Sequence, residues 1–390
     1  MSTTNTTTTT AEIVPKQLSA FIIPGSISTS NNGTLQFGLQ IVNVSFVNAI
    51  RRTILSDIET VVFQTSTPDM NGCNILVNTT RMSNEVLKHR LSAIPIHGMN
   101  HLDEEKMDKL YVEVLLKNET TDVLYLTTEH FLIRSLDSSF PVDELPNRDD
   151  VFPINEISNQ HIDVMLLRPK VEKHYEGDMI HFKCRLSKGK AKQESTYNVV
   201  SHCSYRFKLD DETIQQQLEQ KRQEWQRKGL TKDEALHEET NWLSLDAKRI
   251  FLPNMFEFEI QTIGIFTNEE IMVMACKGLI DRLKDIMDSD DRFLLETSRS
   301  VTMTNAFDIH LKGEDYTIGK MIEYCFYNAL YENAKQLHYI GFVKHHPHDS
   351  DSMLRVAYKR PISLSDVKTD FFKCVNDCIL VLSELQKAFL

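Results

Sequence analysis

The amino-acid sequence predicts an α+β protein in which two similar modules are joined in one chain, the first interrupted by an inserted, mainly β domain. Near both ends of the chain, alternating apolar residues are followed by apolar residues at helical spacing. Between these regions, from about residue 61 to residue 179, the pattern loosens into short candidate strands with proline and aspartate clusters. The segment 298–390 repeats the strand–helix order without a break, which indicates a compact unit of its own.

The composition is typical of a soluble globular protein and argues against a surface devoted to nucleic acid. The 390 residues are 41% hydrophobic and carry a formal net charge of -12, whereas phosphate binding needs clustered lysine and arginine. Seven cysteines without a regular spacing favour free thiols in a reducing compartment. No apolar run reaches the roughly 18 residues of a membrane span.

The first strand and helix are predicted by a change of period. Apolar residues alternate from Leu35 to Ile41, as in a half-buried strand. A helix that Ser45 could cap then carries an apolar residue at every fourth position from Phe46 to Ile58. Arg51 and Arg52 lie off this apolar stripe.

The same order returns after the inserted region. Strands are expected at 180–184, 199–207 and 256–260, and a highly polar helical stretch at 210–240 predicts a solvated arm. A helix after residue 267 has one long apolar face, and residues 288–300 are predicted to be a connector. The expected divisions are a disordered threonine-rich tail at 1–15, a first module at 16–60 plus 180–290, an inserted domain at 61–179, and a second module at 298–390.

The helices of the two modules have apolar faces too wide for one small sheet to cover. Burying a large apolar side chain contributes roughly 1.5–3 kcal/mol, so leaving a whole stripe in water would be costly. We therefore expect the two modules to cover each other as a pseudo-dimer. The residues expected at this interface are Ile50, Ile54, Ile271, Leu279, Ile318, Gly319, Ile322, Phe326, Phe371, Val375 and Leu382.

Several segments carry a family resemblance. Residues 43–58 and 84–96, together with 256–275, resemble the assembly helix, second signature and closing strand and helix of the bacterial RNA polymerase α subunit and of the third-largest subunit of RNA polymerase II. Residues 313–319 and 341–347 resemble the eleventh subunit of the same polymerase. Fusion of the two subunits resembles the arrangement in large nucleocytoplasmic DNA viruses.

The resemblance implies a non-catalytic assembly platform that nucleates the two largest polymerase subunits for transcription. Expected partners also include small zinc-binding subunits resembling the tenth and twelfth, with DNA and RNA met only through the assembled enzyme. A viral origin would place the chain in the host cytoplasm and possibly the virion, and otherwise it belongs in the nucleus. The docking surface for the large subunits is expected to contain Arg51, Arg52, Glu85, His89 and Arg90, although solvated surface charges explain these residues about as well.

Two groups of side chains have the chemistry of metal ligands, and two cysteines could form a thiol pair. Aspartates at 288, 290 and 291 and histidines at 345, 346 and 348 resemble metal ligands, but turns and loops explain them better. Cys374 and Cys378 are predicted to be buried thiols on one helical face. We therefore expect no cofactor, no metal and no catalytic residue in this chain.

Two rival functions remain open. A nucleotidyltransferase acting alone would need paired carboxylates or a glycine-rich phosphate loop, and neither is evident. A free-standing scaffold or transcription factor could use the same dimer fold. Glycine in a helix costs about 1 kcal/mol relative to alanine, so Gly319 predicts a close helix–helix approach.

Overall fold

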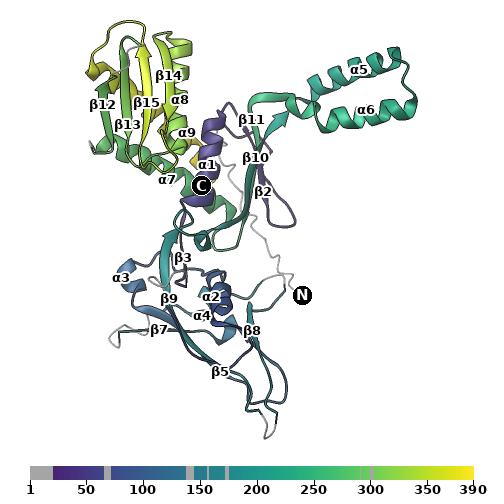
Figure 1. The fold of residues 1–390 in the computed structure, drawn as a ribbon, viewed down its shortest axis with the longest axis vertical. Helices are drawn as coiled ribbons and strands as arrows, with labels where there is room; N and C mark the ends of the chain where they lie inside the picture. The colour runs from purple at the N-terminus through teal and green to yellow at the C-terminus, as the bar shows by residue number, and fades with distance from the viewer. Residues whose placement is uncertain are drawn as a thin grey trace, which may run out of the picture.

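The computed structural model describes residues 21–65, 72–137, 145–155, 158–171, 175–289, 291–298 and 303–390. It contains two units of the same topology, a middle domain and a projecting helical arm (Figure 1). The predicted tail at 1–15 lies outside the described residues. None of the helices in these ranges combines the length and the apolar character needed to cross a bilayer.

The first unit is a four-stranded antiparallel sheet with two helices on one face. Its strands lie in the order β1-β2-β11-β10, and Phe37 of β2 is paired with Phe258 of β11. The side chain of Asn43 accepts a hydrogen bond from the backbone N–H of Ser45, so Asn43 is the N-cap and the prediction that Ser45 caps this helix is wrong. The elements are β1 (Ser28–Thr29), β2 (Leu35–Gln40), α1 (Val44–Ser56), β10 (Val200–Leu209), β11 (Phe251–Thr262) and α7 (Asn268–Asp288).

The second unit repeats this arrangement, with its strands in the order β12-β13-β15-β14. Its first strand falls in the segment predicted to be a connector, because Phe293–Thr297 pairs with Phe307–Leu311 at the sheet edge. After α8 the chain continues as a π-helical turn, Tyr327–Asn333. The elements are β12 (Phe293–Thr297), β13 (Ala306–Leu311), α8 (Tyr316–Phe326), β14 (Leu337–Val343), β15 (Ser352–Tyr358) and α9 (Leu364–Lys387).

The middle domain joins α1 to β10 and has a hydrophobic core of its own. Its main sheet has the order β3-β9-β5-β7, with β4 also paired to β9. The predicted boundary at 179/180 is wrong, because apolar residues at alternate positions of β9, from Ile180 to Leu186, are buried in this core. The elements are β3 (Glu59–Phe63), β4 (Cys73–Asn78), α2 (Asn84–Ser92), α3 (Glu104–Met107), β5 (Leu110–Lys117), β6 (Leu124–Thr127), β7 (Leu132–Ser135), α4 (Arg148–Val151), β8 (Asp163–Leu167) and β9 (Met179–Lys190).

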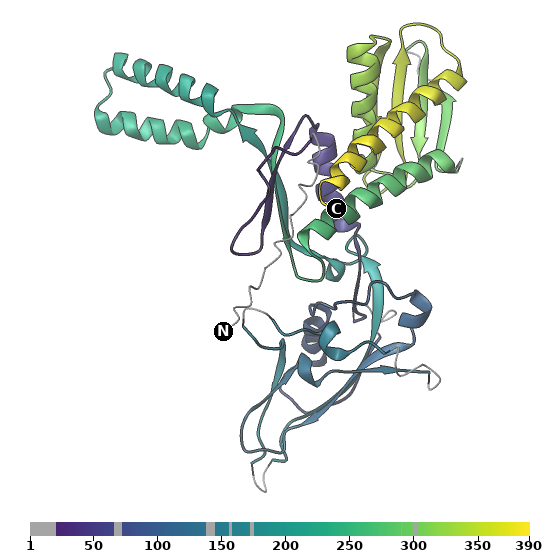
Figure 2. The same ribbon diagram turned by 180° about the vertical axis from the view of Figure 1, so that it is seen from behind.

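The predicted arm is confirmed as helical. Helices α5 (Asp211–Arg227) and α6 (Lys232–Ser244) form a hairpin between β10 and β11 and project away from the rest of the chain (Figure 2). Trp225 and Trp242 belong to its own small hydrophobic cluster. Thr231 and Glu234 form a capping box that starts the second helix of the hairpin.

Candidate functional site at the helix junction

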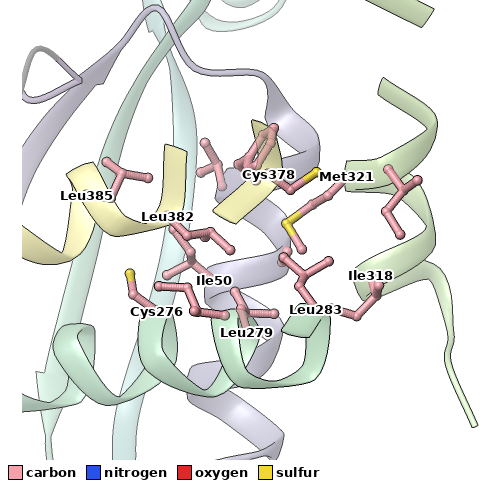
Figure 3. Close-up of a cluster of buried hydrophobic side chains, with 14 of the residues drawn as sticks. Ile50, Cys276, Leu279, Leu283, Ile318, Met321, Cys378, Leu382 and Leu385 are labelled. Carbon is pink, nitrogen blue, oxygen red and sulfur yellow. The ribbon is translucent and has the colours of Figure 1, made fainter. Parts of the chain in front are cut away.

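The most extensive feature shared by the two units is the packing of their helices. Helix α1 packs against α8, and α7 packs against α9, so each helix meets its counterpart in the other unit. The apolar residues of both units form one continuous hydrophobic core. Figure 3 shows side chains from all four helices converging in this junction, among them Ile50, Leu279, Leu283, Ile318, Met321, Cys378 and Leu382.

The structure buries every residue that the sequence predicted for the interface. Figure 3 places Ile50, Leu279, Ile318 and Leu382 where the helices meet. Phe371 also contributes to the interior of its own unit, since its ring stacks on Phe293 with centroids 5.5 Å apart. The remaining predicted residues are buried in the same continuous core or, for the glycine, beside it: Ile54, Ile271, Gly319, Ile322, Phe326 and Val375.

The reason predicted for Gly319 is wrong. A Cβ atom added at this position would lie 1.9 Å from Cε2 of Phe342, a residue of β14 in the same unit. The close approach is therefore between a helix and its own sheet. Glycine is needed because the Phe342 ring occupies the volume that any side chain at position 319 would take.

One end of the junction is charged, a feature that the sequence pattern did not predict. Glu314, whose side chain is 1% exposed, receives a hydrogen bond from Arg282 of α7 and another, of 3.1 Å, from Arg292. Burial is the largest influence on Glu314 and raises its pKa above the ordinary value despite these two arginines. Arg282 also lies 3.6 Å from Asp57, so it connects carboxylates of both units.

Arg52 completes the charged end. Its guanidinium donates to Asp315 at 2.7 Å and to the hydroxyl of Thr317 at 2.8 Å, both at the start of α8. Burial alone would raise the pKa of Asp315, but hydrogen bonds from Thr317 and the charges of Arg52 and Arg282 hold it below its usual value. The acidic pair 314–315 belongs to a motif quoted for its family resemblance, but nothing in the sequence identified its cationic partners.

The other end of the junction is apolar. Phe46 of α1 and Tyr324 of α8 form an edge-to-face ring pair with centroids 6.3 Å apart. Beside them lies an open cavity of about 250 Å³ whose lining includes Val42 and Val381 and, at its polar side, Asn43 and Asp377.

The predicted docking residues fall in different places. Arg51 donates to Asn48 of its own helix at 2.9 Å, while Arg52 is engaged with the second unit. Figure 1 shows α2 in the middle domain, away from the helices of the junction. On α2, Glu85, His89 and Arg90 are exposed and form no ion pair with any part of the chain that the structure describes. Hydrogen bonds from its own backbone and from Ser83 lower the pKa of Glu85.

All seven thiols are buried, and four of them lie in two pairs. Cys325 and Cys378 bring their Sγ atoms to 3.3 Å across α8 and α9, and burial raises the pKa of Cys374 and Cys378 above the ordinary value. Cys73 and Cys184 face each other across β4 and β9. The predicted boundary at 179/180 placed these two cysteines in different domains, so their proximity was not predicted. Within the described ranges, no group of three or more histidine, cysteine or acidic side chains is arranged to hold a metal ion.

Comparison with known proteins identifies a family and several relatives. The model of the RNA polymerase Rpb3/Rpb11 dimerisation domain matches residues 36–283. A conjugation stage-specific protein of Tetrahymena thermophila is 26% identical over 46% of this chain and 57% of its own length. Human DNA-directed RNA polymerases I and III subunit RPAC1 is 26% identical over 48% of this chain and 55% of its own. The chain thus spans just over half the length of these two relatives.

An archaeal relative is covered more completely. DNA-directed RNA polymerase subunit Rpo3 of Thermococcus kodakarensis is 24% identical over 67% of this chain and 93% of its own length. The family match takes in the first unit as far as residue 283 of α7, together with the middle domain and the arm. The second unit lies beyond it.

Proposed function

The chain belongs to the RNA polymerase Rpb3/Rpb11 dimerisation domain family, and on that premise we propose that it is a non-catalytic subunit of a multisubunit DNA-directed RNA polymerase. The names of two relatives, RPAC1 and Rpo3, support a polymerase role. The proposal assigns nucleotidyl transfer to the assembled enzyme, with its Mg²⁺ held by the largest subunit.

The helix junction is the observation that carries this proposal. The second unit repeats the strand order of the first, and the helices of each unit pack on their counterparts. We propose that the second unit is a module like the eleventh polymerase subunit, fused to a module like the third. On this proposal, two dimerisation modules that are otherwise separate proteins pair with each other within a single polypeptide.

The outer surfaces of the paired units and of the middle domain would then capture larger subunits. We propose that Arg51 and the exposed charges of α2, namely Glu85, His89 and Arg90, contact the second-largest subunit, and that this chain then binds the largest subunit and the small zinc-binding subunits. Arginine suits this role because its planar guanidinium makes several directional hydrogen bonds across an interface. Arg52 would contribute through its partly exposed guanidinium, which also binds Asp315. Fusion of both modules would be consistent with a viral polymerase acting in the host cytoplasm.

Purification of an affinity-tagged copy from the native source tests the proposal. We expect the tagged chain to elute with two very large subunits in equimolar amounts, in fractions that synthesise RNA from a DNA template. An independent scaffold or transcription factor would elute without these subunits, and that result would refute the polymerase assignment. RNA synthesis by the isolated chain would refute its non-catalytic role.

A further inference from the structure

The repeat relates the two ends of the junction to each other. Asn43 and Asp315 are the N-caps of α1 and α8, and counting from these caps aligns the buried positions Phe46 with Ile318 and Ile50 with Ile322. The caps of α7 and α9, Thr267 and Ser363, align those helices in the same way: Ile271 with Val367, Leu279 with Val375 and Ile286 with Leu382. Each residue at one end of the junction therefore has an equivalent at the other end.

The equivalent positions differ in charge: their side chains are charged at one end of the junction and neutral at the other. At the charged end, Arg52 and Arg282 of the first unit meet Asp315 and Glu314 of the second. At the apolar end, the second unit presents Tyr324 and Cys378 at the positions of the two arginines. The first unit presents Asn43 and Val42 at the positions of the two acids. In the two pairs that involve Glu314 and Asp315 of the second unit, the cations Arg282 and Arg52 both belong to the first unit, whereas the more exposed pair of Arg292 with Asp285 of α7 crosses in the opposite sense.

We propose that the Arg282–Glu314 and Arg52–Asp315 pairs, in which the first unit supplies both cations, are a specificity device that pairs unlike units and rejects pairing of like units from two copies of the chain. Two second units facing each other would set Glu314 and Asp315 against Cys378 and Tyr324 at both ends. Two first units would set Arg282 and Arg52 against Val42 and Asn43 at both ends. A buried charge that loses its partner disfavours the complex strongly, so the correct pairing is selected mainly by the cost of the wrong ones.

Three further groups face this network and affect what each wrong pairing loses. Asp285 of α7 binds Arg292 at 2.8 Å across the units, but its side chain is 54% exposed, so losing this pair costs little. Asp57 belongs to the first unit and would stay near Arg282 in any pairing, at the 3.6 Å seen here. Arg292 precedes β12 and would stay with Glu314. The selective contacts are therefore Arg282–Glu314 and Arg52–Asp315, which cross between the units. This inference concerns which units pair, and it holds whether or not the chain belongs to a polymerase.

Cleavage of the connector between the units tests it. A site-specific protease sequence is inserted after Ser289, the full chain is purified intact and cleaved, and native mass spectrometry identifies the complexes after dilution and incubation. We expect wild-type fragments to remain almost entirely as unlike pairs. In the variant Arg52→Gln/Arg282→Met/Glu314→Gln/Asp315→Asn, we expect the ratio of like to unlike pairs to rise by at least about tenfold, which corresponds to 1.4 kcal/mol.

The control is an ion pair inside the second unit. Arg355 binds the buried Asp308 at 2.6 Å across β13 and β15, so Asp308→Asn/Arg355→Met removes a comparable pair without touching the junction. This variant should lose stability and still form only unlike pairs. Like pairs at statistical proportions in the wild type, or unlike pairs alone in the fourfold variant, would overturn the inference. If the fourfold variant cannot be purified, Arg282→Met alone is measured in the same way, and an unchanged ratio overturns it.

Discussion

The two units share one topology but differ in the segments inserted between their helices and strands. Between α1 and β10 the first unit holds the whole middle domain, where the second unit has only the π-helical turn and a short loop before β14. Between β10 and β11 the first unit holds the arm, where the second has the short turn between β14 and β15. Insertions are thus tolerated in the connections, while the buried positions of the helices that meet at the junction stay in register from cap to cap. The difference separates the pairing surface from the surfaces available to other partners.

The largest effect is expected where equivalent positions differ most in chemistry. Arg282→Ala should lower the free energy of unfolding by about 3–5 kcal/mol, because it leaves Glu314 buried with one arginine fewer. At the equivalent position, Cys378→Ala should cost about 1 kcal/mol, the value of one methylene-sized group. Urea unfolding followed by far-ultraviolet circular dichroism measures both, since the two tryptophans, Trp225 and Trp242, both lie in the arm. Equal losses would contradict the contrast between the two ends.

A matched pair of truncations tests the likeness of the two units. Ile286 and Leu382 occupy equivalent positions on α7 and α9 and are both 0% exposed. Ile286→Ala and Leu382→Ala should each cost about 2–5 kcal/mol through lost burial and the cavity left behind. Leu380→Ala, at a position on α9 that is 63% exposed, is the control and should change stability by less than about 0.5 kcal/mol. A large loss from only one of the two buried truncations would argue against an equally shared core.

Gly319 tests a difference in helix-to-sheet spacing. Its equivalent in the first unit is Val47, which is fully buried, so the first unit accommodates a side chain where the second admits none. Gly319→Ala should cost about 1–3 kcal/mol because the methyl group overlaps the Phe342 ring. The double variant Gly319→Ala/Phe342→Leu should recover part of this loss in the same unfolding measurement. Absence of any recovery would show that the ring is not the cause.

The helix caps predict a pH response confined to the second unit. Asp315 caps α8, whereas its equivalent is the neutral Asn43. Because the pKa of folded Asp315 lies below its ordinary 3.8, its stabilisation is present above pH 3.8 and lost as the pH falls through the folded pKa. The difference in melting temperature between wild type and Asp315→Asn should therefore shrink as the pH falls from 5 to 3. Asn43→Ala should show no such trend, and a constant difference for Asp315→Asn would refute the prediction.

The smallest effect on stability is expected at Arg51, beside the junction arginine Arg52. Among the residues that the structure describes, Arg51 donates hydrogen bonds only to Asn48 of its own helix, so Arg51→Ala should change the free energy of unfolding by less than about 0.5 kcal/mol. If this side chain docks on the second-largest subunit, the same variant should reduce pull-down of that subunit. Arg222→Ala on the arm is a suitable arginine control, and pull-down equal to wild type would refute docking through Arg51.

The periodicity of the sequence correctly predicted which faces of the helices are buried. It did not predict which distant side chains contact each other. The spacing from Phe46 to Ile54 and from Ile318 to Phe326 correctly predicted buried helical faces, because local period follows directly from helix geometry. It could not show that Glu314 meets Arg282, since such contacts depend on the three-dimensional packing of distant segments. The same reason explains the incorrect account of Gly319, whose neighbour Phe342 lies on a strand.

The prediction of which sheet each strand joins failed for a related reason. The alternation of Ile180, Phe182 and Cys184 identifies a strand but not the sheet that it joins, and β9 proved to be the central strand of the middle domain. The sequence did not predict edge strand β12, because only its first residue, Phe293, is buried. The strand therefore shows little alternation of apolar and polar residues. The domain boundaries predicted at 179/180 and 298 were displaced accordingly.

Between the last residue of α7, Asp288, and the first residue of β12, Phe293, the chain runs for only a few residues. A tether this short keeps the two partners of the junction at a high effective concentration, so their encounter follows first-order kinetics. Dilution should then leave the pairing unaffected, and every translated molecule supplies both partners in equal number. Two separate polypeptides would need matched expression to reach the same result.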